Sequence, residues 1–123
     1  MRILLTGANG YVGRRLLPEL LSQGHEVICC VRDKNRLGLD KTTQERITIW
    51  EVDFLHPINL NNLPEKIDVA YYLIHSMTSS TSDFDVMEGK SAHNFNLYMN
   101  EIGVKQVIYL SGIVNNSELS KHL

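Results

Sequence analysis

Short apolar runs alternate along the chain with longer mixed segments. Five runs predict β-strands, over residues 2–5, 27–31, 47–52, 69–74 and 104–110. The runs at 27–31 and 69–74 are apolar throughout, which is typical of strands buried on both faces. The run at 47–52 alternates apolar and polar residues, as a half-buried strand does.

Segments whose apolar residues recur at helical spacing lie between most of these strands. Apolar residues recur in a helical pattern from Val12 to Leu21, before Gly24, although Pro18 removes one backbone hydrogen bond there. A short helix is predicted within 33–44, one or two helical turns within 57–64, and a helix opening over 117–123. The longest helix begins at Ser82, which with Asp85 resembles a capping box, and it ends before Gly103.

This order of elements predicts one α/β domain over residues 1–123. Strands that alternate with helices form a parallel sheet covered by helices. We therefore expect a doubly wound Rossmann sheet of five strands in the order 3-2-1-4-5. The expected domain ends as the next helix begins, so it corresponds to the N-terminal part of a longer fold.

Composition narrows the class of protein. The 123 residues are 43% hydrophobic and 21% charged, as in one globular domain. Twelve basic residues against 14 acidic ones argue against a nucleic-acid partner or a basic membrane-docking face. No apolar run reaches the roughly 20 residues that span a bilayer. The five histidines show no metal-ligand spacing, so no metal is expected.

The two cysteines are adjacent, at positions 29 and 30. Neighbours on a strand point to opposite faces, so Cys29 and Cys30 are poorly placed to form a disulfide. Two buried free thiols are typical of a reducing compartment. The chain also begins directly with a strand pattern and not with a secretory leader, and a cytoplasmic location is expected.

A glycine-rich turn between the first strand and first helix is the main functional signal. It reads Gly7-Ala8-Asn9-Gly10-Tyr11-Val12-Gly13. Gly7 permits a tight exit from the strand, Gly10 lets a pyrophosphate reach the backbone, and Gly13 lets helix and strand approach. Free N–H groups at the helix start then hold the anion. No Gly-Lys-Ser/Thr follows, so the predicted ligand is a dinucleotide; the alternative is a turn that serves chain geometry alone.

The end of the second strand bears on which dinucleotide binds. Arg32 follows Val31 where sites for NAD place an acidic residue. A guanidinium pairs well with a 2′-phosphate, so NADP(H) is favoured. Asp33 leaves NAD(H) possible, since it could accept a hydrogen bond from the ribose. A solvated charge is the remaining interpretation of Arg32.

Two further strand ends carry candidate residues, because ligands of such sheets lie at the carboxyl ends of the strands. Asp53 could accept a hydrogen bond from the adenine amino group, with Phe54 beside the ring; the alternative is an Asp that caps a turn. Leu73, Ile74 and His75 follow the fourth strand. His75 is either a polar contact or a hydrogen-bonded structural residue.

These features together resemble the short-chain dehydrogenase/reductases, and most closely their atypical NAD(P)H-binding, NmrA-like and complex-I-accessory-subunit-like branch. The matching segments are Thr6–Leu16, Gly24–Val27, Val31–Arg32, Val52–Asp53, Tyr72–Met77 and Gly103–Gly112. Leu-Ile-His-Ser-Met at 73–77 is similar to a sub-branch described as nucleoside-diphosphate-sugar epimerases or as uncharacterised.

The resemblance assigns roles to individual residues. It implies contact with the pyrophosphate for five residues of the turn, Gly7, Asn9, Gly10, Tyr11 and Val12. It implies a 2′-phosphate contact for Arg32 and places Asp53 and Phe54 at the adenine. Leu73, His75 and Ser111 should lie progressively nearer the nicotinamide.

Two departures from this family bear on function. No tyrosine is followed four residues later by lysine, the pair that passes a proton in the reductases, so the catalytic residues are unknown. The chain is also shorter than family members. The strand at 104–110 should therefore pair with a second copy or be covered by a helix.

Three functions remain open. The first is the NADP(H)-binding part of an oxidoreductase or epimerase-like enzyme that acts on a small carbonyl or nucleotide-sugar substrate. The second is a non-catalytic dinucleotide-binding module that senses redox state or stabilises an assembly. The third is a Rossmann-like domain that binds no nucleotide.

Overall fold

A computed structural model of the chain describes residues 1–73 and 82–110. The predicted helix at 117–123 lies outside these residues, as do the last residues of the run at 69–74. In chain order the elements are β1 (Arg2–Thr6), α1 (Tyr11–Ser22), β2 (Glu26–Val31), η1 (Lys34–Arg36), α2 (Lys41–Glu45), β3 (Thr48–Glu51), β4 (Val69–Tyr72), α3 (Ser82–Ile102) and β5 (Gln106–Tyr109).

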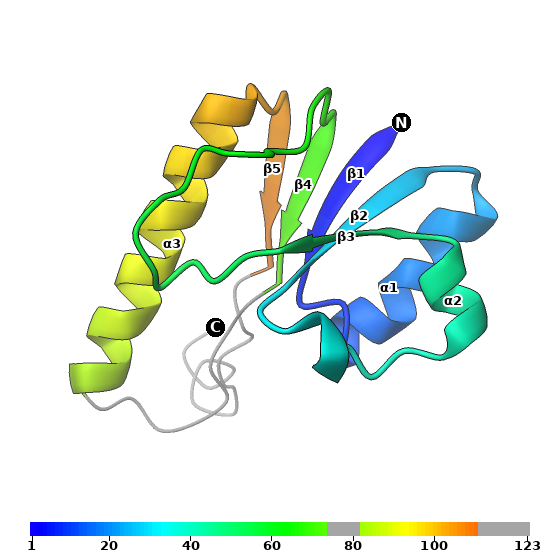
Figure 1. Cartoon of the computed structure of the whole chain (residues 1–123), viewed down its shortest axis with the longest axis horizontal. Coiled ribbons are helices and arrows are strands. Elements are labelled where there is room, and N and C mark those ends of the chain that lie inside the picture. Colours follow the sequence, from blue (N-terminus) through cyan, green and yellow to red (C-terminus); the bar gives the residue numbers. More distant parts are fainter. Residues whose placement is uncertain (74–81, 111–123) are drawn as a thin grey trace, which may run out of the picture.

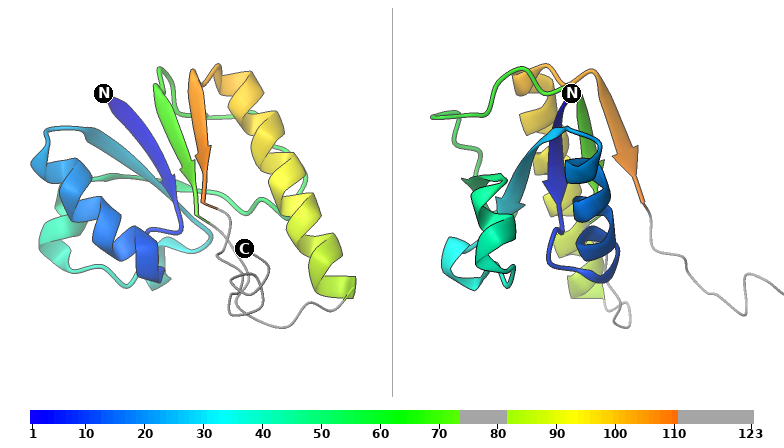
Figure 2. Two further views of the ribbon diagram at one scale, coloured as in Figure 1. Left: turned by 180° about the vertical axis from the view of Figure 1, so that it is seen from behind. Right: turned by 90° about the vertical axis from the view of Figure 1, so that its right-hand side faces the viewer.

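The strands form one parallel sheet in the order β3-β2-β1-β4-β5, which confirms the predicted doubly wound fold. Helices α1 and α2 cover one face and α3 covers the other, so the fold has three layers (Figure 1, Figure 2). The strands run in one direction, and the turn before α1 lies at their carboxyl ends (Figure 1). No helix within residues 1–73 and 82–110 is long and apolar enough to cross a membrane.

Alternation along the strands divides the core between the two faces. Leu5 and Cys29 lie in the cluster that packs on Leu17 of α1. Leu4 and Cys30 lie in the cluster that packs on Phe95 of α3. The two cysteines are free and face opposite sides of the sheet, as predicted. Burial raises the pKa of Cys29 to about 12, so its thiol stays protonated near neutral pH.

The core on the α3 face is rich in aromatic rings. Phe95 is fully buried and lies 4.6 Å from Tyr72 and 5.4 Å from Phe54, measured between ring centroids. Trp50 extends the cluster toward β3 through an edge-on contact of 5.3 Å with Tyr98. Such pairs add to area burial, and here they dock α3 against the sheet.

Two connections differ from the sequence-based expectation. The segment 33–44 contains two short pieces, η1 and α2, and not one helix; Gly38 between them has a φ of +72°. The predicted helical turns within 57–64 are wrong, because that segment holds no helix. Pro57 and Pro64 remove backbone donors there, and Asn62 takes a left-handed φ of +58° that interrupts a helix.

The long helix agrees with its predicted bounds. α3 covers Ser82–Ile102 and stops where Gly103 adopts a φ of +81°, in the left-handed conformation that glycine favours at helix ends. The side chains of the proposed capping box at Ser82 and Asp85 lie outside the described residues. Pro18 is tolerated inside α1, whose apolar stripe continues on both sides of it.

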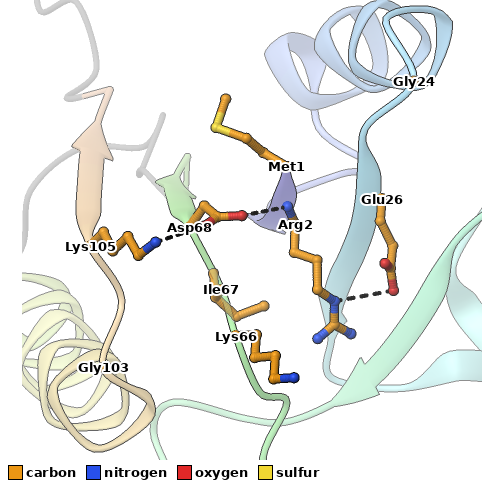
Figure 3. A pocket seen from close by; sticks show the side chains of 9 residues that line it. All are labelled: Met1, Arg2, Gly24, Glu26, Lys66, Ile67, Asp68, Gly103 and Lys105. Carbon is orange, nitrogen blue, oxygen red and sulfur yellow. Dashed lines mark hydrogen bonds and ion pairs between the residues drawn. The ribbon is translucent and has the colours of Figure 1, made fainter.

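A cavity of about 600 Å³ lies at the amino ends of the strands (Figure 3). This is the opposite end of the sheet from the glycine-rich turn. The Asp68 carboxylate accepts the Arg2 backbone N–H at 2.9 Å and lies 3.4 Å from Lys105 Nζ (Figure 3). The Arg2 side chain pairs with Glu26 at 3.1 Å. Both carboxylates therefore have cationic partners. These ion pairs and the Arg2–Asp68 hydrogen bond link the beginnings of β1, β2, β4 and β5.

Asp68 makes stability dependent on pH. The Arg2 N–H and, after it, the Lys105 ammonium hold the pKa of Asp68 below its ordinary value of 3.8. The carboxylate therefore adds stability that is complete above about pH 4 and is lost as the pH falls through the lowered pKa. In urea unfolding, Asp68→Asn should be less stable than wild type at pH 7, and the difference should shrink toward about pH 3. Glu19→Gln is the control, because this exposed carboxylate makes no ion pair among the described residues. A difference that stays constant with pH would contradict the role of Asp68.

Candidate functional site

The turn between β1 and α1 is closed by its own backbone. Gly7 has a φ of +71°, and its carbonyl accepts the Gly10 N–H at 3.0 Å. A β-carbon on Gly13 would lie only 2.0 Å from the Gly7 oxygen. Glycine at 13 is therefore required for the helix to begin this close to the strand, as the sequence analysis predicts.

The beginning of α1 presents unpaired donors. Gly10 is the N-cap and has no side chain to accept a hydrogen bond. The N–H groups of Tyr11, Val12 and Gly13 have no acceptor among the described residues. The first turn also holds no acidic residue. Bare N–H groups and the positive end of the helix dipole form a favourable environment for an anion.

The other residues of the turn differ in exposure. Asn9 and Gly10 are exposed, whereas Ala8 is buried beneath them. A β-carbon on Gly10 would meet only the Gly7 oxygen, at 3.4 Å, so its outer side is open. The Tyr11 side chain is 72% exposed and its ring stacks with the guanidinium of Arg15. Tyr11 and Val12 can therefore reach an anion through their backbone N–H groups.

Thr6 links the glycine-rich turn to the carboxyl end of β4. Its hydroxyl donates to the Tyr71 carbonyl at 3.0 Å and accepts the Leu73 N–H at 2.9 Å. A β-carbon on Gly7 would lie 3.3 Å from the Leu73 Cβ. The carboxyl ends of β1 and β4 are thus held in contact, and Leu73 is buried there. This role of Thr6 has no signal in the sequence, because a threonine at the end of a buried strand forms no distinctive pattern.

The residues after β2 separate into one free cation and one engaged carboxylate. Arg32 is exposed and makes no hydrogen bond or ion pair within the described part of the chain. The Asp33 carboxylate accepts the Asn35 N–H at 2.9 Å and so caps η1. It also lies 3.8 Å from the Nε of Arg36. The Oδ1 of Asp33 is thus engaged within the loop, whereas Arg32 has no partner among the described residues.

The strand end after β3 departs from the simplest expectation. Asp53 accepts the Leu55 N–H at 2.9 Å, so it caps a turn, as the alternative interpretation held. Phe54 is only 5% exposed, and its ring packs within the core against Phe95 and Tyr98. The ring therefore supports the end of β3 from within the core.

Asn94 of α3 stabilises this same turn. It is buried, and its side-chain amide donates to the Phe54 carbonyl at 2.6 Å and to the His56 carbonyl at 3.3 Å. The sequence analysis gave it no role, since an asparagine within a long helix is ordinary. Three predicted site residues, Ile74, His75 and Ser111, lie outside the described residues.

The sheet topology and the donor-lined turn define a class of protein, the Rossmann-fold proteins that bind dinucleotides. A sequence profile described as NAD(P)H-binding matches residues 7–122. The chain therefore belongs to the NAD(P)H-binding family, and the predicted resemblance to the short-chain dehydrogenase/reductases is confirmed.

Three similar proteins indicate which kinds of protein the chain resembles within this family. A Bacillus halodurans protein assigned to the NAD-dependent epimerase/dehydratases has a TM-score of 0.72 and 27% identity, over 92% of this chain and 52% of its own. The Gre2–NADPH complex of Candida albicans has a TM-score of 0.70 and 15% identity, over 89% and 36%. The photosystem II assembly factor Ycf39 of Synechocystis is 23% identical over 90% of this chain and 33% of its own. The chain thus spans about half the length of the Bacillus protein and about a third of the other two.

The approach of α1 to the turn can be tested with two glycines. Gly13→Ala should lower the free energy of unfolding by roughly 2–3 kcal/mol, since the new β-carbon meets backbone atoms that cannot rotate away. Gly89→Ala, in the open interior of α3, should raise it by about 0.5–1 kcal/mol. Urea unfolding measures both. Equal effects of the two substitutions would refute the close approach.

Proposed function

We propose that residues 1–123 form an NADP(H)-binding domain whose pyrophosphate site is the beginning of α1. The observation that carries this proposal is the set of three unpaired N–H groups, at Tyr11, Val12 and Gly13, beside a glycine that leaves them uncovered. A pyrophosphate supplies negatively charged oxygen atoms that can accept hydrogen bonds from these N–H groups. Membership of the NAD(P)H-binding family supports this placement.

The loop after β2 supports a preference for NADP(H) over NAD(H). Selection of NAD requires a carboxylate that is free to accept from the ribose 2′-OH. Asp33 instead caps η1, whereas the exposed Arg32 is free to pair with a 2′-phosphate.

The full-length protein that contains this domain is proposed to be an oxidoreductase or epimerase-like enzyme. When bound, the nicotinamide supplies or accepts a hydride. A small carbonyl or nucleotide-sugar substrate fits the likeness to the Bacillus epimerase/dehydratase. In this proposal Asp53 and Phe54 lie at the adenine and Ile74 lines the ribose and pyrophosphate crevice. Leu73, His75 and Ser111 lie progressively nearer the nicotinamide. Residues that complete the substrate pocket would come from outside this chain.

A second candidate function is a non-catalytic module that binds the dinucleotide to sense redox state or stabilise an assembly. Two observations favour it. The chain lacks a Tyr-x-x-x-Lys pair, and it is similar to a photosystem II assembly factor over 90% of its length. Binding alone supports both functions, and turnover of a carbonyl substrate by the full-length protein separates them.

Two further features belong to this proposal. β5 is the last strand of the described sheet, and Tyr109 and Leu110 are 51% and 42% exposed beside it. We propose that a second copy of the chain pairs at this edge. The buried free thiols Cys29 and Cys30 support a reducing, cytoplasmic environment.

Calorimetric titration with NADPH, NADH and ATP tests the proposed cofactor. We expect NADPH to bind most tightly and ATP least. Gly10→Val should abolish binding of both dinucleotides, because its side chain would cover the helix N–H groups. The unfolding midpoint should change little, since the backbone at Gly10, with a φ of −86°, suits any residue. Unaltered binding by a folded Gly10→Val protein would refute the pyrophosphate placement.

Sedimentation velocity tests the proposed pairing at β5. The 123-residue chain should sediment as a dimer at micromolar concentration. Leu110→Lys should shift it toward monomer, because a charge beside an edge strand opposes pairing with another strand. Leu60→Lys, at a leucine that is 51% exposed and distant from this edge in sequence, is the matched control. A wild-type monomer would refute the pairing.

A further inference from the structure

The turn that follows β3 is attached to the sheet on one side and to α3 on the other. The Val52 N–H donates at 2.8 Å to the carbonyl that ends β2, and so continues the pairing of β3 with β2. Beyond Asp53, the Asn94 side-chain amide donates to the carbonyls of Phe54 and His56, at 2.6 and 3.3 Å. Asp53 therefore lies between two anchored pieces of backbone.

Asn94 provides the second of these anchors. It is buried, as is Phe54, whose carbonyl has no other donor among the described residues. A buried carbonyl without a donor costs free energy. A side-chain amide has two N–H donors and can therefore give one to each of two carbonyls. An apolar residue at position 94 would leave the Phe54 carbonyl unpaired, and the turn would gain by reorienting toward water.

The Asp53 carboxylate has one oxygen engaged in the turn and one without a hydrogen-bond donor in the described part of the chain. Oδ1 accepts the Leu55 N–H at 2.9 Å. Oδ2 lies 3.7 Å from the Nε2 of His56, which is too long for a hydrogen bond. The side chain is 26% exposed, so a ligand can reach it. The conformation of the turn thus sets the direction in which Oδ2 points.

Asp53 lies two strands away from the proposed pyrophosphate site. β2 separates β3 from β1, and the carboxyl ends of these parallel strands lie at one edge of the sheet (Figure 1). Neighbouring strands are about 4.8 Å apart, so the ends of β1 and β3 are separated by roughly 10 Å. An adenosine whose phosphate lies on α1 can span this separation and bring its base to Asp53.

We propose that Asn94 is a positioning residue for recognition of the adenine amino group. By holding the carbonyls of the turn, it directs the Oδ2 of Asp53 toward that group. This inference rests on the proposed function, in which Asp53 lies at the adenine. Asn94 itself touches no ligand, because it is buried beneath the turn. The consequence is selectivity for adenine over purine, since purine lacks the 6-amino donor.

The test compares NADPH with its analogue in which purine replaces adenine. The analogue lacks only the 6-amino group and keeps the pyrophosphate and the 2′-phosphate. Asn94→Leu approximately keeps the side-chain volume and removes both N–H donors. Tyr98→Phe is the matched control, because it removes the hydroxyl that accepts the Asn59 N–H at 2.9 Å, another hydrogen bond between α3 and the same segment. Calorimetry gives each dissociation constant, and thermal unfolding confirms that each variant is folded.

Wild type should bind NADPH about tenfold more tightly than the purine analogue, as one hydrogen bond to a charged group provides. Asn94→Leu should reduce this preference to within about twofold, mainly by weakening NADPH, whereas Tyr98→Phe should retain it. Asp53→Ala should also remove the preference. Adding Asn94→Leu to Asp53→Ala should change it no further, because Asn94 acts through Asp53.

A second variant covers the case in which Asn94→Leu is too unstable to titrate. Asn94→Ser has a shorter side chain that cannot reach both carbonyls, and it should lose the preference as well. A preference that survives in the folded Asn94 variant would overturn the positioning role. Equal weakening of both ligands, or the same loss of preference in Tyr98→Phe, would also overturn it.

The outcomes separate this inference from the proposed function. If wild type prefers NADPH and the Asn94 variants keep that preference, the positioning role alone is wrong. If wild type binds NADPH and the purine analogue equally tightly, Asp53 does not select the adenine, and the inference fails while the pyrophosphate site stands. If wild type binds neither ligand, the proposed function is refuted and the inference with it.

Discussion

The contact between Gly13 and the Gly7 carbonyl is the constraint on which the rest of the site depends. It lets α1 begin directly above the end of β1, so the helix presents its first N–H groups at the edge of the sheet. Any side chain at 13 would push the helix away from the strand. Gly10 stands at the N-cap and has no side chain that could accept these N–H groups, which is why the donors remain unpaired.

The two ends of the sheet meet opposite physical demands. At the amino ends, the Asp68 carboxylate pairs with a backbone N–H and a lysine, and Arg2 pairs with Glu26, so the charges there compensate one another. At the carboxyl ends, the N–H groups of α1 and the Arg32 side chain have no acceptor among the described residues. A domain that satisfies its charges at one end and leaves donors open at the other is arranged to bind an anion at the second.

The fold was largely predictable because its signals are local. Apolar runs, helical spacing and terminal glycines are read within a few residues, and they predicted the sheet order and the bounds of α3. The segment 57–64 was not predictable in this way. Besides its two prolines and the left-handed Asn62, it depends on a tertiary contact, in which the Asn59 N–H donates to the Tyr98 hydroxyl at 2.9 Å. Contacts between residues this distant in sequence leave no periodic pattern.

The same distinction between local signals and tertiary contacts applies to the candidate site. The glycine turn was predicted because each glycine answers a local steric demand. The burial of Phe54 was missed, since it depends on Phe95 and Tyr98 of a helix some forty residues later. A glycine-rich turn can therefore be predicted from adjacent residues, whereas the packing of Phe54 emerges only when α3 docks against the end of β3.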